Sequence, residues 1–161
     1  MFNIKAEIYL RIIFLFSLIA LISAYFIEHV LGHQPCNLCL IERIPYGLSI
    51  ILIFFMFILK RNENFFILLL ILTFIFSFFI SSYHFGIEQG IFQESTVCGV
   101  KNFSENISKE ELLNKLSEKT ISCKDVTFRI LGLSLTTINI VISILIIITL
   151  SKIFTKYEKN K

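Results

Sequence analysis

The chain has few charged residues and no tryptophan. Charged side chains make up 17% of its 161 residues, whereas hydrophobic side chains make up 55%. A soluble domain of this size does not usually carry so much apolar mass, and long apolar runs indicate membrane spans instead. The net charge of +3 is also too small to indicate a nucleic-acid partner. The composition therefore favours an integral membrane protein in contact with the lipid bilayer.

Four apolar segments account for this composition. They cover about residues 8–30, 44–59, 65–83 and 130–153. One helical crossing of the bilayer needs about 20 residues, and the shortest segment, the second, approaches that length if the residues just before it are included. Backbone groups in lipid must pair within their own segment, so we expect an all-α membrane protein with a four-helix transmembrane bundle. The first segment is longer than a signal-peptide core, and no A-x-A-like cleavage site follows it.

Basic residues predict the orientation in the membrane. They gather at the start of the first segment, in the turn between the second and third, and after the fourth: Lys5, Arg11, Lys60, Arg61, Lys152, Lys156, Lys159 and Lys161. By the positive-inside rule, this side and both chain termini should be cytoplasmic. The long loop before the fourth segment also carries basic residues. Acidic residues nearly balance them, and long loops respond less to charge.

The two remaining loops, about residues 31–43 and 84–129, then face the opposite side. In a bacterial cell that side is the periplasm, where disulfides persist. Within the longer loop, Ser108–Lys119 begins with a capping-box pattern and carries one apolar stripe. We expect a short amphipathic helix there, either on the bilayer surface or folded against its own loop. No internal repeat or low-complexity linker divides the chain, so residues 1–161 are expected to form one domain.

Four cysteines lie in these two loops as two pairs. Cys36 and Cys39 form a C-x-x-C, while Cys98 and Cys123 lie far apart in the long loop. Disulfide exchange proceeds through a mixed disulfide, and the second thiol of a C-x-x-C is close enough to resolve it. A nearby cation favours the thiolate, and Arg43 lies four residues beyond Cys39. Two such pairs on one face of a membrane can pass electrons to each other.

Spacing alone leaves other interpretations open. His29, His33, Cys36 and Cys39 supply two imidazoles and two thiols, enough for a tetrahedral zinc site, although that leaves the second cysteine pair without a role. A small membrane protein with purely structural disulfides is a further alternative. Against it, a C-x-x-C loop is too small to act as an effective entropic staple. Arg43 can equally serve as an anchor at the membrane surface.

Three motifs resemble the disulfide bond formation protein B family, DsbB. Residues 36–43, CNLCLIER, match its C-x-L-C-x-x-x-R signature, and residues 83–88, YHFGIE, resemble the Y-H-x-G-x-E segment of many members. Residues 131–134, LGLS, resemble the family pattern at the start of the last span. The resemblance covers nearly the whole chain and is more specific than a lone C-x-x-C. The vitamin K epoxide reductase-like family performs similar chemistry, but there the C-x-x-C normally follows the separated pair.

The resemblance implies a protein-disulfide:quinone oxidoreductase of the bacterial inner membrane. Members of the family reoxidise the periplasmic oxidant DsbA and give the electrons to ubiquinone or menaquinone. By analogy, Cys98–Cys123 is the disulfide that reduced DsbA attacks. Its electrons would pass to Cys36–Cys39 and then to a membrane quinone. A dedicated thiol partner in place of general DsbA is also compatible with the sequence.

Two further residues are implicated in the quinone site by the resemblance. Arg43 would stabilise negative charge on a thiolate or on the quinone, and His84 would line the pocket. Several relatives carry a tryptophan near this pocket, which the present chain lacks. Phenylalanine would therefore supply any ring stacking. No resident metal is implied.

Overall fold

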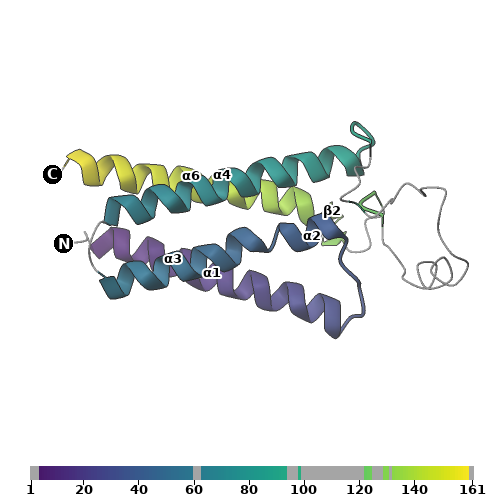
Figure 1. Cartoon of the computed structure of the whole chain (residues 1–161), viewed down its shortest axis with the longest axis horizontal. Helices are drawn as coiled ribbons and strands as arrows, with labels where there is room; N and C mark the ends of the chain where they lie inside the picture. Colours follow the sequence, from purple (N-terminus) through teal and green to yellow (C-terminus); the bar gives the residue numbers. More distant parts are fainter. Residues whose placement is uncertain are drawn as a thin grey trace, which may run out of the picture.

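The computed structural model describes residues 4–59, 63–93, 98, 122–124, 129–130 and 132–159. Its long helices are α1 (Ile4–His29), α3 (Ile44–Leu59), α4 (Glu63–Glu88) and α6 (Leu135–Lys159), and a short helix, α2 (Asn37–Ile41), precedes α3. Figure 1 shows these helices side by side, with α4 along α6 and α3 along α1. Both chain ends lie at the end of the bundle opposite α2.

The outer faces of the four long helices are apolar. Ile19, Ile58 and Phe79, for example, are 60%, 60% and 64% exposed, and a soluble protein rarely presents so extensive an apolar surface to water. Four helical segments are long and apolar enough to cross a membrane: Ala6–His29, Asn37–Leu59, Glu63–Glu88 and Leu135–Lys156. The predicted all-α class with four spanning helices is therefore confirmed, and the chain is a multi-pass membrane protein.

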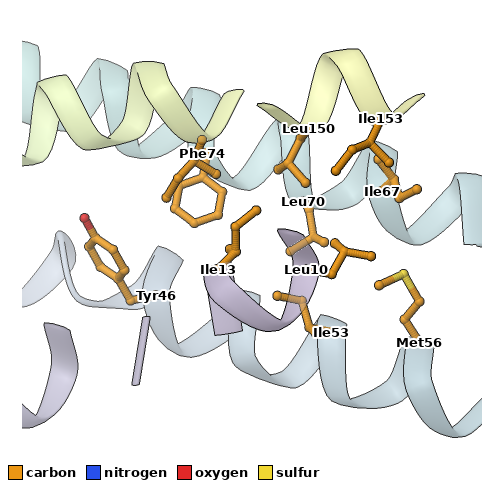
Figure 2. Close-up of a cluster of buried hydrophobic side chains, with 11 residues drawn as sticks. Leu10, Ile13, Tyr46, Ile53, Met56, Ile67, Leu70, Phe74, Leu150 and Ile153 are labelled. Atoms are coloured by element: carbon orange, nitrogen blue, oxygen red, sulfur yellow. The ribbon is translucent and has the colours of Figure 1, made fainter. Parts of the chain in front are cut away.

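The interior of the bundle combines an apolar cluster with small polar contacts. Figure 2 shows buried side chains of the cluster around Phe74, which is fully buried. Ser49 Oγ donates a hydrogen bond to Ser17 Oγ at 2.9 Å between α3 and α1, and Ser143 Oγ donates to Ser77 Oγ at 3.2 Å between α6 and α4. Small residues allow helices in lipid to approach closely, and paired hydroxyls avoid leaving polar groups in hydrocarbon. These contacts hold α3 against α1 and α6 against α4.

The second span is broken immediately after the C-x-x-C. Residues 37–41 form α2, Glu42 and Arg43 form a turn, and α3 begins at Ile44. Pro45 lies in the first turn of α3, where its missing N–H would have had no helical partner. The break therefore separates the helical turn that carries the cysteines from the rest of the span.

Helix α4 is longer than the expected segment of residues 65–83. It continues to Glu88, and the chain turns at Gly90, whose φ of 73° favours glycine. The Gly86 carbonyl accepts hydrogen bonds from the N–H groups of Ile91 at 2.8 Å and Phe92 at 3.1 Å, which closes the end of the helix. His84 is consequently part of the helix and not of the loop that was expected to begin at residue 84.

Helix α6 begins at Leu135 instead of near residue 130. The residues before it form a small antiparallel hairpin, in which β1 (Arg129–Ile130) pairs with β2 (Leu133–Ser134). Gly132 lies in its turn with a φ of 82°, a conformation that favours glycine. Ser134 Oγ accepts a hydrogen bond from the Thr137 N–H at 3.3 Å and so caps the first turn of α6.

The predicted amphipathic helix at Ser108–Lys119 lies outside the described residues, as do Lys60 and Arg61. The orientation in the membrane and the single-domain organisation stay predictions.

Candidate active site

All four cysteines meet in one buried cluster. Cys36, Cys98 and Cys123 are 6%, 2% and 3% exposed, and Cys39 packs against them. Cys98 and Cys123 are joined by a disulfide, whereas Cys36 and Cys39 are not bonded to each other. Two cysteine pairs that are far apart in the sequence therefore share a single site. The tertiary fold gives the proximity that the sequence could only suggest.

Cys36 caps the N-terminus of α2. Its Sγ accepts a hydrogen bond from the Cys39 backbone N–H at 3.3 Å, and the two Sγ atoms lie 2.6 Å apart. The hydrogen bond from the Cys39 thiol lowers the pKa of Cys36 from 9.0 to about 5; burial opposes this change, and His84 adds to it. Since the thiolate is the nucleophile, Cys36 is the activated sulfur of the pair.

His84 lies between Cys36 and a carboxylate. Its Nε2 is 3.6 Å from Cys36 Sγ, and its Nδ1 is 2.9 Å from Glu42 Oε1. The His84 side chain is 3% exposed and that of Glu42 is 11% exposed. The resemblance implicates His84 in a quinone pocket, and the structure places its ring against the Cys36 thiol.

Glu42, which no sequence pattern had singled out, bonds through both of its carboxylate oxygens. Oε1 accepts from His84, and Oε2 accepts from Asn139 Nδ2 at 3.2 Å. Asn139 Nδ2 also donates to Ser81 Oγ at 2.7 Å, and the Tyr46 hydroxyl donates to Asn139 Oδ1. An acidic residue beside an apolar span usually has a partner and a function, and this signal could have identified Glu42.

A second carboxylate, Glu88, lies on the other side of His84. Its Oε1 is 4.0 Å from His84 Nε2 and accepts a hydrogen bond from Thr136 Oγ1 at 2.6 Å. Thr136 in turn hydrogen-bonds to Ser134 at 2.6 Å. Glu88 was also missed, because the expected end of the third span left it in a loop. The extra turns of α4 bring it into the site.

Arg43 bonds to a partner on α1. Its Nη1 lies 2.5 Å from Glu28 Oε2, and its guanidinium is 5.1 Å from the centre of the Tyr25 ring. The ion pair of Arg43 with Glu28 thus connects α1 to the turn between α2 and α3. The Arg43 side chain also lines the cavity that Cys36 and Cys39 line.

The cavity beside the thiols has a volume of about 270 Å³. Its walls are mainly apolar side chains of α1 and α6, and the polar groups gather at the cysteine end. The apolar lining includes Phe16, Ala20, Leu21 and Ile142, and the polar lining includes Cys36, Cys39, Arg43, His84 and Cys123. Mainly apolar walls with a few convergent polar groups are typical of sites for small organic ligands.

Comparison with known proteins gives the family. The family Disulfide bond formation protein DsbB matches residues 6–152. The chain belongs to the DsbB family. The uncharacterised protein RP370 of Rickettsia prowazekii (strain Madrid E) is 31% identical over 147 residues, which are 90% of this chain and 86% of that protein. As a DsbB-family member, the chain is a membrane-bound disulfide oxidoreductase.

Membership of the DsbB family also bears on the zinc alternative. Among the described residues, Cys36, Cys39 and His84 place one ligand atom each within 4.8 Å of one another, and neither His29 nor His33 belongs to that group. The fold therefore does not assemble the predicted four-residue zinc site, and the family favours a redox pair instead.

Alkylation of Cys36 in the reduced DsbB-family protein is expected to have a midpoint near pH 5, which is the pKa of this thiol. Only the thiolate reacts, so the rate should be level above about pH 6 and fall as the sulfur is protonated below the midpoint. Reaction with iodoacetamide, followed by mass spectrometry of the Cys36 peptide, measures this profile. In Cys39→Ala, which lacks the donor thiol, the midpoint should rise toward 9.0. A wild-type midpoint near 9 would contradict this assignment.

Proposed function

We propose that the protein reoxidises a DsbA-like periplasmic dithiol and passes the electrons to a membrane quinone, either ubiquinone or menaquinone. The observation that carries this proposal is the packing of all four cysteines in one buried cluster beside an apolar cavity. The activity would support disulfide formation in periplasmic proteins. The family is consistent with this role because its members are disulfide oxidases.

The proposed location is the bacterial inner membrane, with the cysteine end of the bundle in the periplasm. Arg11 lies near the start of α1, and Lys152 and Lys156 lie near the end of α6. These helix ends lie opposite α2 (Figure 1). By the positive-inside rule, the end with these basic residues is cytoplasmic, which leaves the thiols in an oxidising compartment.

Electron entry would begin at the loop disulfide. A thiolate of the partner attacks Cys98–Cys123, a mixed disulfide forms, and the second partner thiol displaces the loop sulfur. The partner leaves oxidised, and the loop pair holds two electrons and two protons as a dithiol. Cys123 lines the cavity together with Cys36 and Cys39. We therefore assign Cys123 to exchange with the C-x-x-C and Cys98 to exchange with the partner.

The internal transfer then moves the electrons to the membrane side. Attack of the Cys123 thiolate on Cys36 breaks the Cys36–Cys39 bond, and closure of Cys98–Cys123 releases the C-x-x-C as a dithiol. An oxidised loop pair with a reduced C-x-x-C is the state expected after this step. Return to the starting state requires an acceptor of two electrons.

The residues around the cavity fit a quinone. A quinone bound there would supply the acceptor chemistry, taking up two electrons and two protons. The apolar walls suit an isoprenoid-substituted ring, and Phe16 and Tyr46 offer the aromatic surface that tryptophan supplies in several relatives. Arg43 would attract negative charge at the polar end, and His84 would exchange protons with the thiols.

An anaerobic assay tests the proposed function. Purified protein in lipid nanodiscs is mixed with a reduced DsbA-like partner and with ubiquinone or menaquinone in parallel. We expect one quinone to be reduced for each partner disulfide formed, and the preferred quinone to react faster. Cys36→Ala, Cys39→Ala, Cys98→Ala and Cys123→Ala should each abolish turnover, while Thr149→Ala at an exposed site on α6 should not. Full turnover in Cys36→Ala would refute the relay.

A further inference from the structure

We infer that Glu42 is the positioning residue of a Cys36–His84–Glu42 triad, in which it holds the His84 ring so that Nε2 receives the Cys36 proton. Only the identity of the final electron acceptor rests on the proposed function. The triad would work when the C-x-x-C is oxidised back to its disulfide. It assigns a chemical role to a carboxylate that otherwise looks like an ordinary acidic residue at the membrane surface.

The order of contacts is that of a nucleophile, a base and an orienting acid. Cys36 Sγ lies 3.6 Å from His84 Nε2, and His84 Nδ1 lies 2.9 Å from Glu42 Oε1. The three side chains come from the start of α2, from α4 and from the turn after α2. In such an arrangement the acid fixes the tautomer and the orientation of the ring and stabilises the imidazolium that forms.

The carboxylate itself is held rigidly. Glu42 Oε2 accepts from Asn139 Nδ2, and Asn139 is fixed by the Tyr46 hydroxyl and by Ser81. Residues of α3, α4 and α6 thus converge on one carboxylate that is 11% exposed. A buried charge is costly unless it is paired, and an apolar side chain would fill this position at lower cost. Helix packing alone does not account for a carboxylate here.

The proton and electron balance is complete. Oxidation of the dithiol forms the Cys36–Cys39 bond, breaks two S–H bonds and sends two electrons and two protons to the membrane quinone. The Cys36 proton moves first to His84 Nε2, while the Nδ1 proton stays in the hydrogen bond to Glu42. The imidazolium therefore faces a carboxylate instead of hydrocarbon. It then releases the Nε2 proton into the cavity, which His84 lines.

Other ionisable groups also surround the ring. Glu88 approaches Nε2 at 4.0 Å from the neighbouring turn of α4, but its Oε1 already accepts from Thr136. The remaining ionisable groups around the shared cavity are Cys39, Tyr46, His33 and Arg43, of which Arg43 is paired with Glu28. Glu88 is thus the competing partner of His84, and it needs its own variant in the test.

The experiment measures iodoacetamide alkylation of Cys36 against pH in the reduced protein, with no quinone and no partner. In Glu42→Gln we expect the midpoint to rise from near pH 5 to near pH 6 and the rate at pH 5 to fall about fivefold, because the neutral amide no longer favours the thiolate–imidazolium pair. Glu42→Asp should recover most of the rate. Glu88→Gln should have a smaller effect, and Glu7→Gln, whose carboxylate pairs with Arg11 at the opposite end of α1, should have none.

A Glu42→Gln profile that superimposes on the wild type would overturn the inference, as would a larger effect of Glu88→Gln. A second measurement on the wild-type protein avoids any dependence on variant folding. The chain has three histidines, so nitrogen-15 spectra of the labelled imidazoles are simple to assign with His84→Gln. We expect His84 Nδ1 to carry a hydrogen-bonded proton throughout the neutral range. An unprotonated Nδ1 would overturn the triad. Neither readout uses quinone, so failure of the proposed function would leave both results interpretable.

Discussion

A variant that retains only Cys36 and Cys123 is expected to form a disulfide between these two residues under mild oxidation. Both sulfurs belong to the buried cluster, and both line the cavity. The double substitution Cys39→Ala, Cys98→Ala removes their present partners, so the remaining thiols can react only with each other within the chain. Because both lie in one buried cluster of the same chain, formation should be fast and independent of protein concentration. Peptide mapping under non-reducing conditions identifies the bond.

The matched control retains Cys39 and Cys98 by means of Cys36→Ala and Cys123→Ala. Cys98 does not line the cavity with Cys39 in the described structure, so its bond to Cys39 should form about 100-fold more slowly, since misplacement by about 1 Å can cost that factor. Equal rates in the two variants would contradict the assignment of Cys123 as the sulfur that exchanges with the C-x-x-C. The relay order would then have to be reversed.

Replacement of Arg43 by methionine is expected to raise the KM for quinone by about 10–100-fold, the range that corresponds to loss of a charged hydrogen bond worth about 1.5–3 kcal/mol. Methionine keeps much of the apolar stem but removes the cation that lines the cavity. Thiol–disulfide exchange between the two cysteine pairs should be much less affected. Steady-state quinone reduction and a single-turnover exchange measurement, made on the same preparation, separate the two effects.

Glu28→Gln is the matched control for Arg43. It removes the negative partner of the ion pair and leaves the guanidinium beside Tyr25 and the cavity. We expect the KM for quinone to stay close to that of the wild type. Thermal stability in detergent should fall slightly, because the ion pair between α1 and the second span is lost. If Glu28→Gln raises the KM as much as Arg43→Met does, Arg43 acts as a membrane-surface anchor and not as a cavity cation.

Hydropathy predicted the four spans correctly because lipid imposes a nearly fixed length of apolar helix. The ends of the spans were less predictable. Residues 84–88 carry a histidine and a glutamate that read as loop residues, yet they stay helical because both side chains find buried partners. Residues 129–134 are apolar enough to continue a span, yet they turn at Gly132 in a hairpin. Partners distant in sequence decided where α4 ends, whereas a local turn at Gly132 decided where α6 begins.

The functional site, like the ends of the spans, was only partly predictable from the sequence. Spacing identified the two cysteine pairs, and the resemblance added Arg43 and His84. The ion pair of Arg43 with Glu28 joins residues 15 apart, and the bond of Glu42 to Asn139 joins residues 97 apart. No local pattern reports such contacts. In the sequence Asn139 is only a polar residue within an apolar span, because its hydrogen bond is to a carboxylate from another span.

The sequence by itself determined that this protein crosses the membrane four times and carries two cysteine pairs in the connections between its spans. Both properties depend on composition and local spacing, which act within a single segment. Only the tertiary structure decided that the four sulfurs share one buried cluster and that Glu42, His84 and Cys36 form a line of contacts. Those features depend on how separate helices pack. Packing brings side chains from different helices into contact, and the sequence of one helix does not show which side chains of another it will meet.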